Sequence, residues 1–349
     1  MTGAPAPILR LAGRWREEFP GSPGGCLLLP AGAVFAGLAG LRGWAFDRGL
    51  FRQQRLPVPV ISLGNLTAGG TGKTPAVATV AAWLRARGRR PAVVSRGYRA
   101  GLDGRNEEAS LMGDVPVFCN PDRLAGGRRA IADGADVVIL DDGFQHRRLA
   151  RDLDIVVIDA TRPWGRDDGG PGRFLPAGYL RESPRQARRA GLLWLTRTDL
   201  VDPERLARLR GECALLAPGV PLVEERATAA WLSPMGSGDR ISAADWAGRR
   251  VILASGLGHP GAFEAQAAGL GLAVQTSVRF PDHHHYRPVD VAVLERMGRD
   301  HQAVVVVTGK DAVKLTCLPG TGGFQILGIT SALVDPTPLL AALARLPGV

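Results

Sequence analysis

The chain has 349 residues, which is enough for two domains of roughly 150 residues each. Its hydrophobic fraction of 45% and charged fraction of 22% are ordinary for a globular protein. The four cysteines lack CxxC spacing, which argues for a reducing compartment and against a disulfide framework or a cysteine zinc site. These residues are Cys26, Cys119, Cys213 and Cys317.

The formal net charge of +10 indicates an anionic partner. Nucleic acid, an anionic membrane surface and acidic small substrates would all satisfy it. Because arginine is dispersed and no nucleic-acid motif is recognisable, we expect phosphate ligands and a membrane surface, and no nucleic acid.

The N-terminal segment is apolar, with no charged residue in the range Phe19–Leu41. Four arginines follow it: Arg42, Arg48, Arg52 and Arg55. As a helix, the segment would place on one face Val34, Leu38, Leu41 and Ala45. We expect a helix that lies on the membrane, with the arginines near lipid phosphates. A core-packed helix is the alternative, and a spanning helix is marginal because Pro30 and several glycines interrupt it.

Apolar runs that resemble buried strands recur along the chain: Pro59–Leu63, Ala92–Ser95, Val137–Leu140, Ile155–Ile158, Leu192–Thr196, Val251–Ala254, Val304–Thr308 and Phe324–Gly328. They alternate with amphipathic segments such as Pro75–Arg87, a pattern that predicts an α/β protein with a mostly parallel sheet covered by helices. The polar passages at residues 184–189 and 218–234 are where we expect chain crossovers or a domain junction, with a boundary near residue 215.

The stretch "GNLTAGGTGKTP" (Gly64–Pro75) lies between a strand-like and a helix-like run and predicts a phosphate-binding loop. The glycines can present backbone N–H groups to phosphate oxygens, and the following helix directs its positive dipole end at the same anion. Lys73 supplies a charge for the outer phosphates, and the Thr74 hydroxyl can bind Mg²⁺. The predicted nucleotide-binding residues are Thr67, Ala68, Gly69, Gly70, Thr71, Gly72, Lys73 and Thr74. The window begins with Thr67 where a glycine is usual.

A second motif, "ADVVILDDGFQH" (Ala135–His146), supports this interpretation. A phosphate loop needs a carboxylate at the end of a neighbouring strand to hold Mg²⁺. Asp141 and Asp142 occupy that position. The two motifs together predict a site for a nucleoside triphosphate and Mg²⁺, with Thr74, Asp141 and Asp142 as metal ligands.

The residues leave the phosphoryl acceptor open. "TRTD" (Thr196–Asp199) is placed like the guanine-reading motif of a GTPase, but Arg197 stands where a lysine is expected. "FPDHHHYRP" (Phe280–Pro288) would suit a metallochaperone-like NTPase, because His283 and His285 share a face if the stretch is extended. A soluble phosphate-loop switch or metallochaperone is therefore an alternative to an enzyme.

The sequence resembles the tetraacyldisaccharide 4′-kinase family, the lipid A 4′-kinases of Gram-negative bacteria. The resemblance is collinear over nearly the whole chain, and it includes the atypical first position of the phosphate loop. Besides the two motifs above, it is carried by "SRGY" (Ser95–Tyr98), "GDVP" (Gly113–Pro116), "LPAGYLRE" (Leu175–Glu182), "FPDHHHY" (Phe280–Tyr286) and "TGKDAVKL" (Thr308–Leu315).

This resemblance implies ATP-dependent transfer of a phosphoryl group to the 4′-hydroxyl of a tetraacylated glucosamine disaccharide 1-phosphate, a lipid A precursor. It implies a membrane-associated helical segment over residues 1–50, a phosphate-loop kinase domain over 51–215 and a smaller α/β domain over 216–349 that completes the active-site cleft. It also implies association with the cytoplasmic face of the inner membrane.

The resemblance further implies roles for individual residues. Asp114 is the candidate base, His283 is its partner, and Lys73 and Arg123 complete the catalytic set. The candidate substrate-binding residues are Gln145, Arg181 and Glu182, with Arg181 directed at a phosphate. One departure from the family pattern is Gly309, which stands where an acidic residue is usual. Lys310 and Asp311 are therefore left out of the predicted site.

Overall fold

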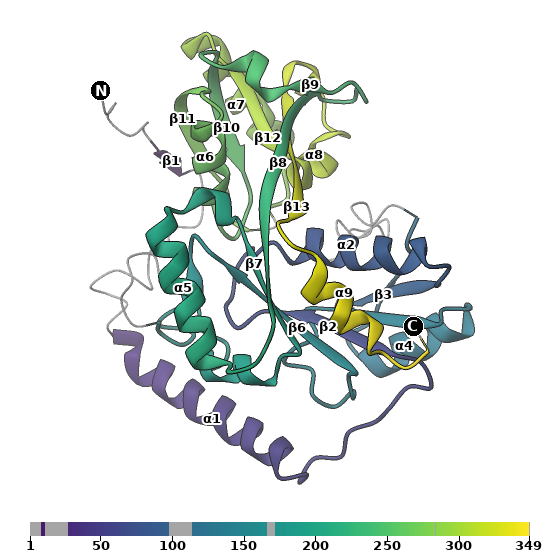
Figure 1. Ribbon diagram of the computed structural model, residues 1–349. Helices are drawn as coiled ribbons and strands as arrows, with labels where there is room; N and C mark the ends of the chain where they lie inside the picture. The colour runs from purple at the N-terminus through teal and green to yellow at the C-terminus, as the bar shows by residue number, and fades with distance from the viewer. Residues whose placement is uncertain (1–7, 11–26, 98–113, 166–171, 283, 349) are drawn as a thin grey trace. The chain divides into compact units, whose positions relative to one another are not determined.

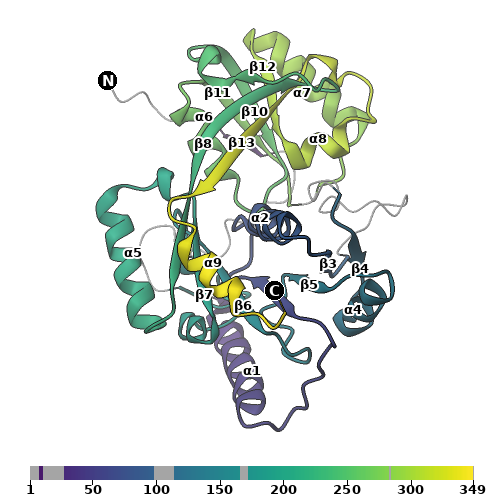
Figure 2. The ribbon, with the colours of Figure 1, turned by 45° about the vertical axis from the view of Figure 1, so that its right-hand side comes forward.

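The computed structural model describes residues 8–10, 27–97, 114–165, 172–282 and 284–348. These residues divide into two compact units, one formed by residues 20–225 and 333–349 and the other by residues 1–19 and 226–332. We call them the phosphate-loop unit and the C-terminal unit. Strands β8 (Leu222–Pro234) and β13 (Gln325–Leu333) carry the chain across the boundary in opposite senses. Figure 1 and Figure 2 show both strands.

The phosphate-loop unit is built on a sheet whose strand order is β8-β7-β6-β2-β5-β3-β4. Its strands are β2 (Val60–Gly64), β3 (Pro91–Ser95), β4 (Val117–Cys119), β5 (Val137–Asp141), β6 (Leu153–Asp159), β7 (Leu192–Thr196) and the first part of β8. Every pairing along this order is parallel. The carboxyl ends of β2, β5, β6 and β7 therefore meet at one edge of the sheet, where ligands bind in open α/β folds.

Alternate residues of these strands enter two different cores. Helices α2 (Lys73–Ala86) and α9 (Thr337–Ala344) pack on the face that presents Ile61, Ile139 and Trp194. Helices α4 (Arg123–Ala132) and α5 (Pro203–Leu216) cover parts of the opposite face. Because both faces are covered, the central strands are apolar throughout, and this is why they appeared in the sequence as continuous hydrophobic runs.

The C-terminal unit has the strand order β1-β11-β10-β12-β13-β8, and β9 (Ile241–Ser242) pairs antiparallel with β8. The other strands are β1 (Ile8–Arg10), β10 (Arg250–Ser255), β11 (Ala273–Arg279) and β12 (Val304–Thr308). The helices are α6 (Pro260–Gly269), α7 (Pro288–His301) and α8 (Gly309–Leu315). Helices α7 and α8 pack on one face of β10 and β12, and α6 packs on the other.

The predicted α/β class is confirmed. The polar passage at residues 218–234, where the sequence predicts a crossover or domain junction, contains the boundary between the two units, after Glu225, and most of it forms the long strand β8. The glutamates of β8 make the segment polar in sequence, so a search for apolar runs does not mark it as a strand. In the folded protein these glutamates are paired. The Glu225 carboxylate accepts a 2.7 Å hydrogen bond from the Trp194 indole, and Glu224 pairs with Arg210. The unit division also places residues 333–349 with the phosphate loop, whereas the sequence assigned them to the C-terminal domain.

The N-terminal helix α1 (Leu29–Asp47) is exposed over most of its length. Val34, Leu38 and Leu41 are 60% exposed or more, so a core-packed helix is wrong for this face. Ala45, expected on the same face, is buried. In the described part of the chain, α1 is the one helix long and apolar enough to cross a membrane.

The packing of α2 gives the first prediction. Leu84 on α2 is fully buried, whereas Leu215 on α5 is 84% exposed. Leu84→Ala should lower the free energy of unfolding by about 2–5 kcal/mol because it leaves a cavity, and Leu215→Ala should change it by less than about 0.5 kcal/mol. Chemical denaturation of the detergent-solubilised protein measures both values, and equal effects would contradict the packing described.

Candidate active site

The phosphate loop joins the carboxyl end of β2 to the amino end of α2. Its left-handed positions are glycines, at Gly69 (φ 112°) and Gly72 (φ 85°). A Cβ on Gly72 would lie 3.1 Å from the Thr196 side chain, so any other residue here would be strained by the left-handed backbone and would crowd Thr196. Gly72 is the N-cap of α2 and no side chain caps the helix, so the first N–H groups of α2 face a position suited to an anion.

The first residues of the predicted nucleotide-binding window form hydrogen bonds with another segment of the protein. Thr67 forms an antiparallel bridge with Leu180, and the Ala68 N–H donates a 2.7 Å hydrogen bond to the Tyr179 carbonyl. The Thr71 N–H donates to the Gly69 carbonyl. We therefore expect phosphate oxygens to be bound by the amides of Gly69, Gly70 and the first turn of α2, and not by that of Ala68.

Asp142 lies at the centre of a charged cluster. Arg181 donates to both of its carboxylate oxygens at 2.9 and 2.7 Å, and Lys73 Nζ is 3.5 Å from Oδ1. Burial opposes ionisation of this carboxyl, but Lys73 and Arg181 outweigh it and lower the pKa of Asp142 to about 2. The Asp142 backbone is left-handed (φ 55°), which is costly outside glycine and is typical of functional positions.

Asp141 is the last residue of β5 and is buried. Asp141 pairs in register with Leu63 of β2, so it lies at the same edge of the sheet as the beginning of the phosphate loop. Thr74, in the first turn of α2, is also buried. Hydroxyl and carboxylate oxygens are the ligands that Mg²⁺ prefers, with phosphate and water oxygens completing the shell. The residues present therefore fit Mg²⁺.

Other metals are less well served. Among the residues that the structure describes, no three His, Cys, Asp or Glu side chains are grouped to hold a metal ion. In the histidine stretch, His284 Nε2 lies 3.1 Å from Asp290 and its ring stacks on Phe280. Neither the absence of such a group among the described residues nor the contacts of His284 supports the metallochaperone alternative. His283 itself lies outside the described residues.

Arg123 and Gln145 support the loop geometry from within the protein. Arg123 is buried, and its guanidinium donates to the backbone carbonyls of Asn120 and Asp141 at 3.0 and 3.3 Å. The Gln145 side chain donates to the Asn65 carbonyl at 2.9 Å. The Arg123 contacts join the end of β5 to the residue after β4, and the Gln145 contact joins the segments that follow β5 and β2. A catalytic role for Arg123 and a substrate contact by Gln145 stay predictions.

Glu182 is engaged away from the charged cluster. Its carboxylate is 2.5 Å from Arg189, whose guanidinium lies over the Phe144 ring. Burial raises the pKa of Glu182 against the opposing effect of Arg189. A substrate contact by Glu182 also stays a prediction, and it would require this pair to open.

The predicted base, Asp114, is accessible. Its side chain is 90% exposed and lies 3.7 Å from Arg85 of α2. Arg85 is in the last turn of α2, whereas Lys73 begins that helix, so the structure does not bring Asp114 beside the phosphate loop. The role of Asp114 as the base stays a prediction. The rest of the "GDVP" motif is described from Asp114 onward only.

Two groups that the sequence left out have clear structural roles. Asp311 is fully buried and accepts hydrogen bonds from Thr308, Tyr286 and the Gly256 N–H, which join the loops after β10, β11 and β12. Arg197 donates a 3.0 Å hydrogen bond to the Gly70 carbonyl in the phosphate loop and pairs with Asp159. The "TRTD" motif, placed like the guanine-reading motif of a GTPase, was the sequence feature that could have identified Arg197 as a residue of the site. For Asp311 the sequence offered only its place in a family motif.

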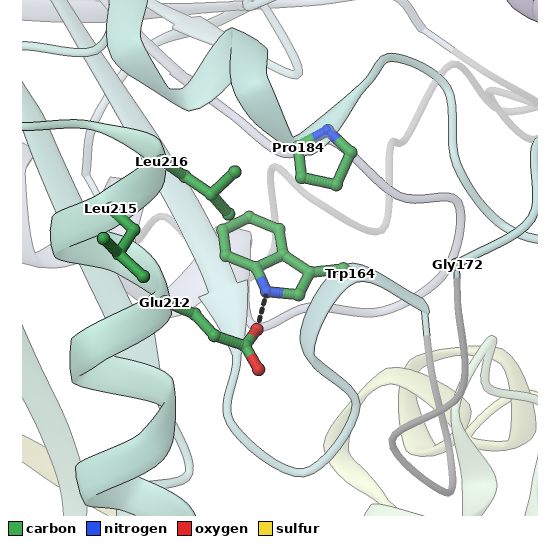
Figure 3. A pocket seen from close by; sticks show the side chains of 6 residues that line it. All are labelled: Trp164, Gly172, Pro184, Glu212, Leu215 and Leu216. Carbon is green, nitrogen blue, oxygen red and sulfur yellow. Dashed lines mark hydrogen bonds between the residues drawn. The ribbon is translucent and has the colours of Figure 1, made fainter.

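An apolar pocket of about 350 Å³ lies elsewhere in the phosphate-loop unit. Leu215 and Leu216 of α5 face Trp164 and Pro184 across it, and the Trp164 indole donates a 2.7 Å hydrogen bond to Glu212 (Figure 3). Its one carboxylate is therefore engaged. We place the phosphoryl chemistry at the charged cluster around Asp142 and not in this pocket.

The charged cluster makes a prediction about pH. Because the pKa of Asp142 is depressed, the ion pairs contribute to stability above the ordinary carboxyl range near 3.8 and are lost as pH falls toward about 2. Arg181→Met removes the closest charge and both hydrogen bonds, and should raise the pKa of Asp142. The carboxyl ¹³C shift of labelled aspartate, assigned through Asp142→Asn, reports it. A wild-type pKa at or above 3.8 would contradict the geometry.

Comparison with known proteins agrees with these features. A profile of the family described as tetraacyldisaccharide-1-P 4′-kinase matches residues 25–345. A tetraacyldisaccharide 4′-kinase from Anaeromyxobacter dehalogenans (strain 2CP-C) is 43% identical, covering 86% of this chain and 85% of its own. One from Pelobacter propionicus is 36% identical, covering 96% of both chains. 

A solved structure also matches over most of the chain. It is the crystal structure of an "apo" form of LpxK from Aquifex aeolicus in complex with ATP, with a TM-score of 0.68 and 28% identity. It covers 92% of this chain and 98% of its own. The chain therefore belongs to the tetraacyldisaccharide-1-P 4′-kinase family.

Proposed function

We propose that this protein transfers the terminal phosphoryl group of ATP to the 4′-hydroxyl of a tetraacylated disaccharide 1-phosphate, a step of lipid A biosynthesis, at the cytoplasmic face of the inner membrane. The observation that carries the proposal is the convergence of Lys73 and Arg181 on Asp142 beside the amides of the phosphate loop. Family membership supports the same reaction and disfavours a soluble switch or metallochaperone.

The reaction needs positioning and charge neutralisation more than covalent chemistry. The phosphate-loop amides and Lys73 hold the β- and γ-phosphates, and Arg181 is placed to neutralise charge on the transferred group or on the acceptor's 1-phosphate. Mg²⁺, held by Thr74, Asp141 and Asp142, would supply further neutralisation of the phosphate oxygens.

Asp114 acts as the base in this proposal. Its carboxylate takes the proton of the 4′-hydroxyl while that oxygen bonds to the γ-phosphorus, and the bond to the bridging oxygen breaks to leave ADP. His283 orients Asp114 or adjusts its pKa. Glu182 pairs with Arg189 in the folded protein, and it would contact the substrate only if this pair opens.

Helix α1 gives the enzyme its access to lipid. Its exposed face presents Val34, Leu38 and Leu41, while its last turns are fixed to the loop after Asp142. Arg147 donates to the Gly43 carbonyl and pairs with Asp47, and Arg42 donates to the Gln145 carbonyl. Arg42 is thus engaged within the protein, and so is Arg55, which pairs with Asp152 at 2.8 Å, so a role in binding lipid phosphates falls to Arg48 and Arg52. An apolar face flanked by arginines suits the surface of an anionic bilayer.

Removing the proposed catalytic groups should abolish most activity. Lys73→Ala and Asp114→Ala should each lower turnover by at least ~10²-fold, the scale of losing one positioned catalytic group. Transfer of ³²P from [γ-³²P]ATP to the lipid phase of a bacterial extract measures turnover. Asp133→Ala, at another exposed aspartate of the same unit, should leave it unchanged. Wild-type turnover by Asp114→Ala would remove Asp114 from the mechanism.

Membrane association should depend on the exposed face of α1. Replacing Val34, Leu38 and Leu41 together by Gln should move the protein from sedimented anionic vesicles into the supernatant, because burial of apolar side chains drives interfacial binding. The control carries three Gln substitutions at other exposed apolar positions, Leu215, Val289 and Val313. If the two triple variants sediment equally, α1 is not the membrane contact.

A further inference from the structure

The ends of β6 and β7 contact the phosphate loop on the side opposite to β5, the strand that ends at Asp141. In the strand order, β6 and β5 flank β2 on opposite sides. On the β6 side, the Thr196 hydroxyl donates a 2.9 Å hydrogen bond to the Thr71 carbonyl, and Arg197 donates to the Gly70 carbonyl. The phosphate loop therefore has two chemically different flanks.

Arg197 is held in an unusual and specific conformation. Its backbone is left-handed (φ 57°, ψ 37°), which costs free energy for a residue with a Cβ. Its guanidinium pairs with Asp159, a side chain that is 3% exposed. The Asp159 carboxylate also accepts hydrogen bonds from the N–H and the hydroxyl of Thr161. One edge of the guanidinium is thus fixed, while 21% of the Arg197 side chain remains exposed.

The other flank is already committed to the transferred phosphoryl group. Asp141 and Asp142 lie on the β5 side, and Arg181, which comes from the segment between β6 and β7, pairs with Asp142; these are the groups assigned to metal and phosphate. A nucleotide whose terminal phosphate is directed there has its nucleoside at the other end of the phosphate chain. The nucleoside therefore leaves the loop toward the ends of β6 and β7, where Arg197 is exposed.

We propose that the guanidinium of Arg197 is the stacking surface for the purine base of the bound nucleotide. This inference rests on the proposed function and adds the nucleoside subsite to it. A guanidinium is planar, delocalised and weakly hydrated, so it stacks on aromatic rings better than an ammonium group does. Its pairing with Asp159 and Gly70 fixes the plane before the base arrives, which lowers the entropic cost of binding.

The test compares a ligand that has a base with one that lacks it. Isothermal titration of the full-length, detergent-solubilised protein with Mg²⁺ and either ADP or inorganic tripolyphosphate gives both affinities. Arg197→Lys keeps the charge beside Asp159 and removes the plane. It should weaken ADP binding by about ten-fold, the order of one lost base-stacking contact, and change tripolyphosphate binding by less than about two-fold. Arg197→Ala should weaken ADP at least as much.

The remaining outcomes separate the possible errors. Equal weakening of both ligands by Arg197→Lys would make Arg197 a brace of the phosphate loop and overturn the stacking surface, as would unchanged ADP affinity. Arg208→Ala, which removes an exposed arginine of α5, should affect neither ligand. If the wild-type protein binds tripolyphosphate but not ADP, the subsite fails. If it binds neither, the proposed kinase function fails as well.

Discussion

The placement of the Asp142 carboxylate between Lys73 and Arg181 is the interaction on which the site depends. It links three parts of the chain, namely the first turn of α2, the loop after β5 and the "LPAGYLRE" segment. It also neutralises two cations that would otherwise repel each other across a narrow, half-buried space. An incoming phosphate must compete with this carboxylate for Lys73, so the lysine is already positioned near its target and needs only to exchange one anion for another.

The same loop connects the proposed chemistry to α1, the helix that we propose lies on the membrane. Asp141 and Asp142 are followed within a few residues by Gln145 and Arg147. The Gln145 carbonyl accepts a hydrogen bond from Arg42 of α1, and Arg147 donates one to the Gly43 carbonyl of the same helix. A lipid headgroup carries its acyl chains into the bilayer, so its sugar can reach ATP only if the nucleotide site is fixed close to that surface. The contacts between α1 and this loop supply such a fixed connection within one unit of the protein.

Sequence reasoning reached the local parts of this arrangement and missed the distant ones. The strand, phosphate loop and helix around Lys73 are contiguous, and the continuous apolar runs that alternate with amphipathic segments predicted the sheet. By contrast, the hydrogen bond from Ala68 to Tyr179 and that from Arg197 to Gly70 depend on which strands are neighbours, so the pattern around each residue could not reveal them. Glu182 shows the same limit, because its motif does not say whether the side chain faces the site or Arg189. The strand β8 was missed because its glutamates make the segment polar in sequence. Their partners, Trp194 and Arg210, lie on other elements, so the local pattern could not show that these glutamates are paired.

The most direct measurement is a crystal structure with a non-hydrolysable ATP analogue and Mg²⁺. We predict that its phosphates lie on the amides of Gly69, Gly70 and the first turn of α2, that Lys73 Nζ has moved from Asp142 to a phosphate oxygen, and that Asp142 keeps its contact with Arg181. A nucleotide bound elsewhere, or a phosphate loop without ligand in which Lys73 still pairs with Asp142, would contradict the proposed site.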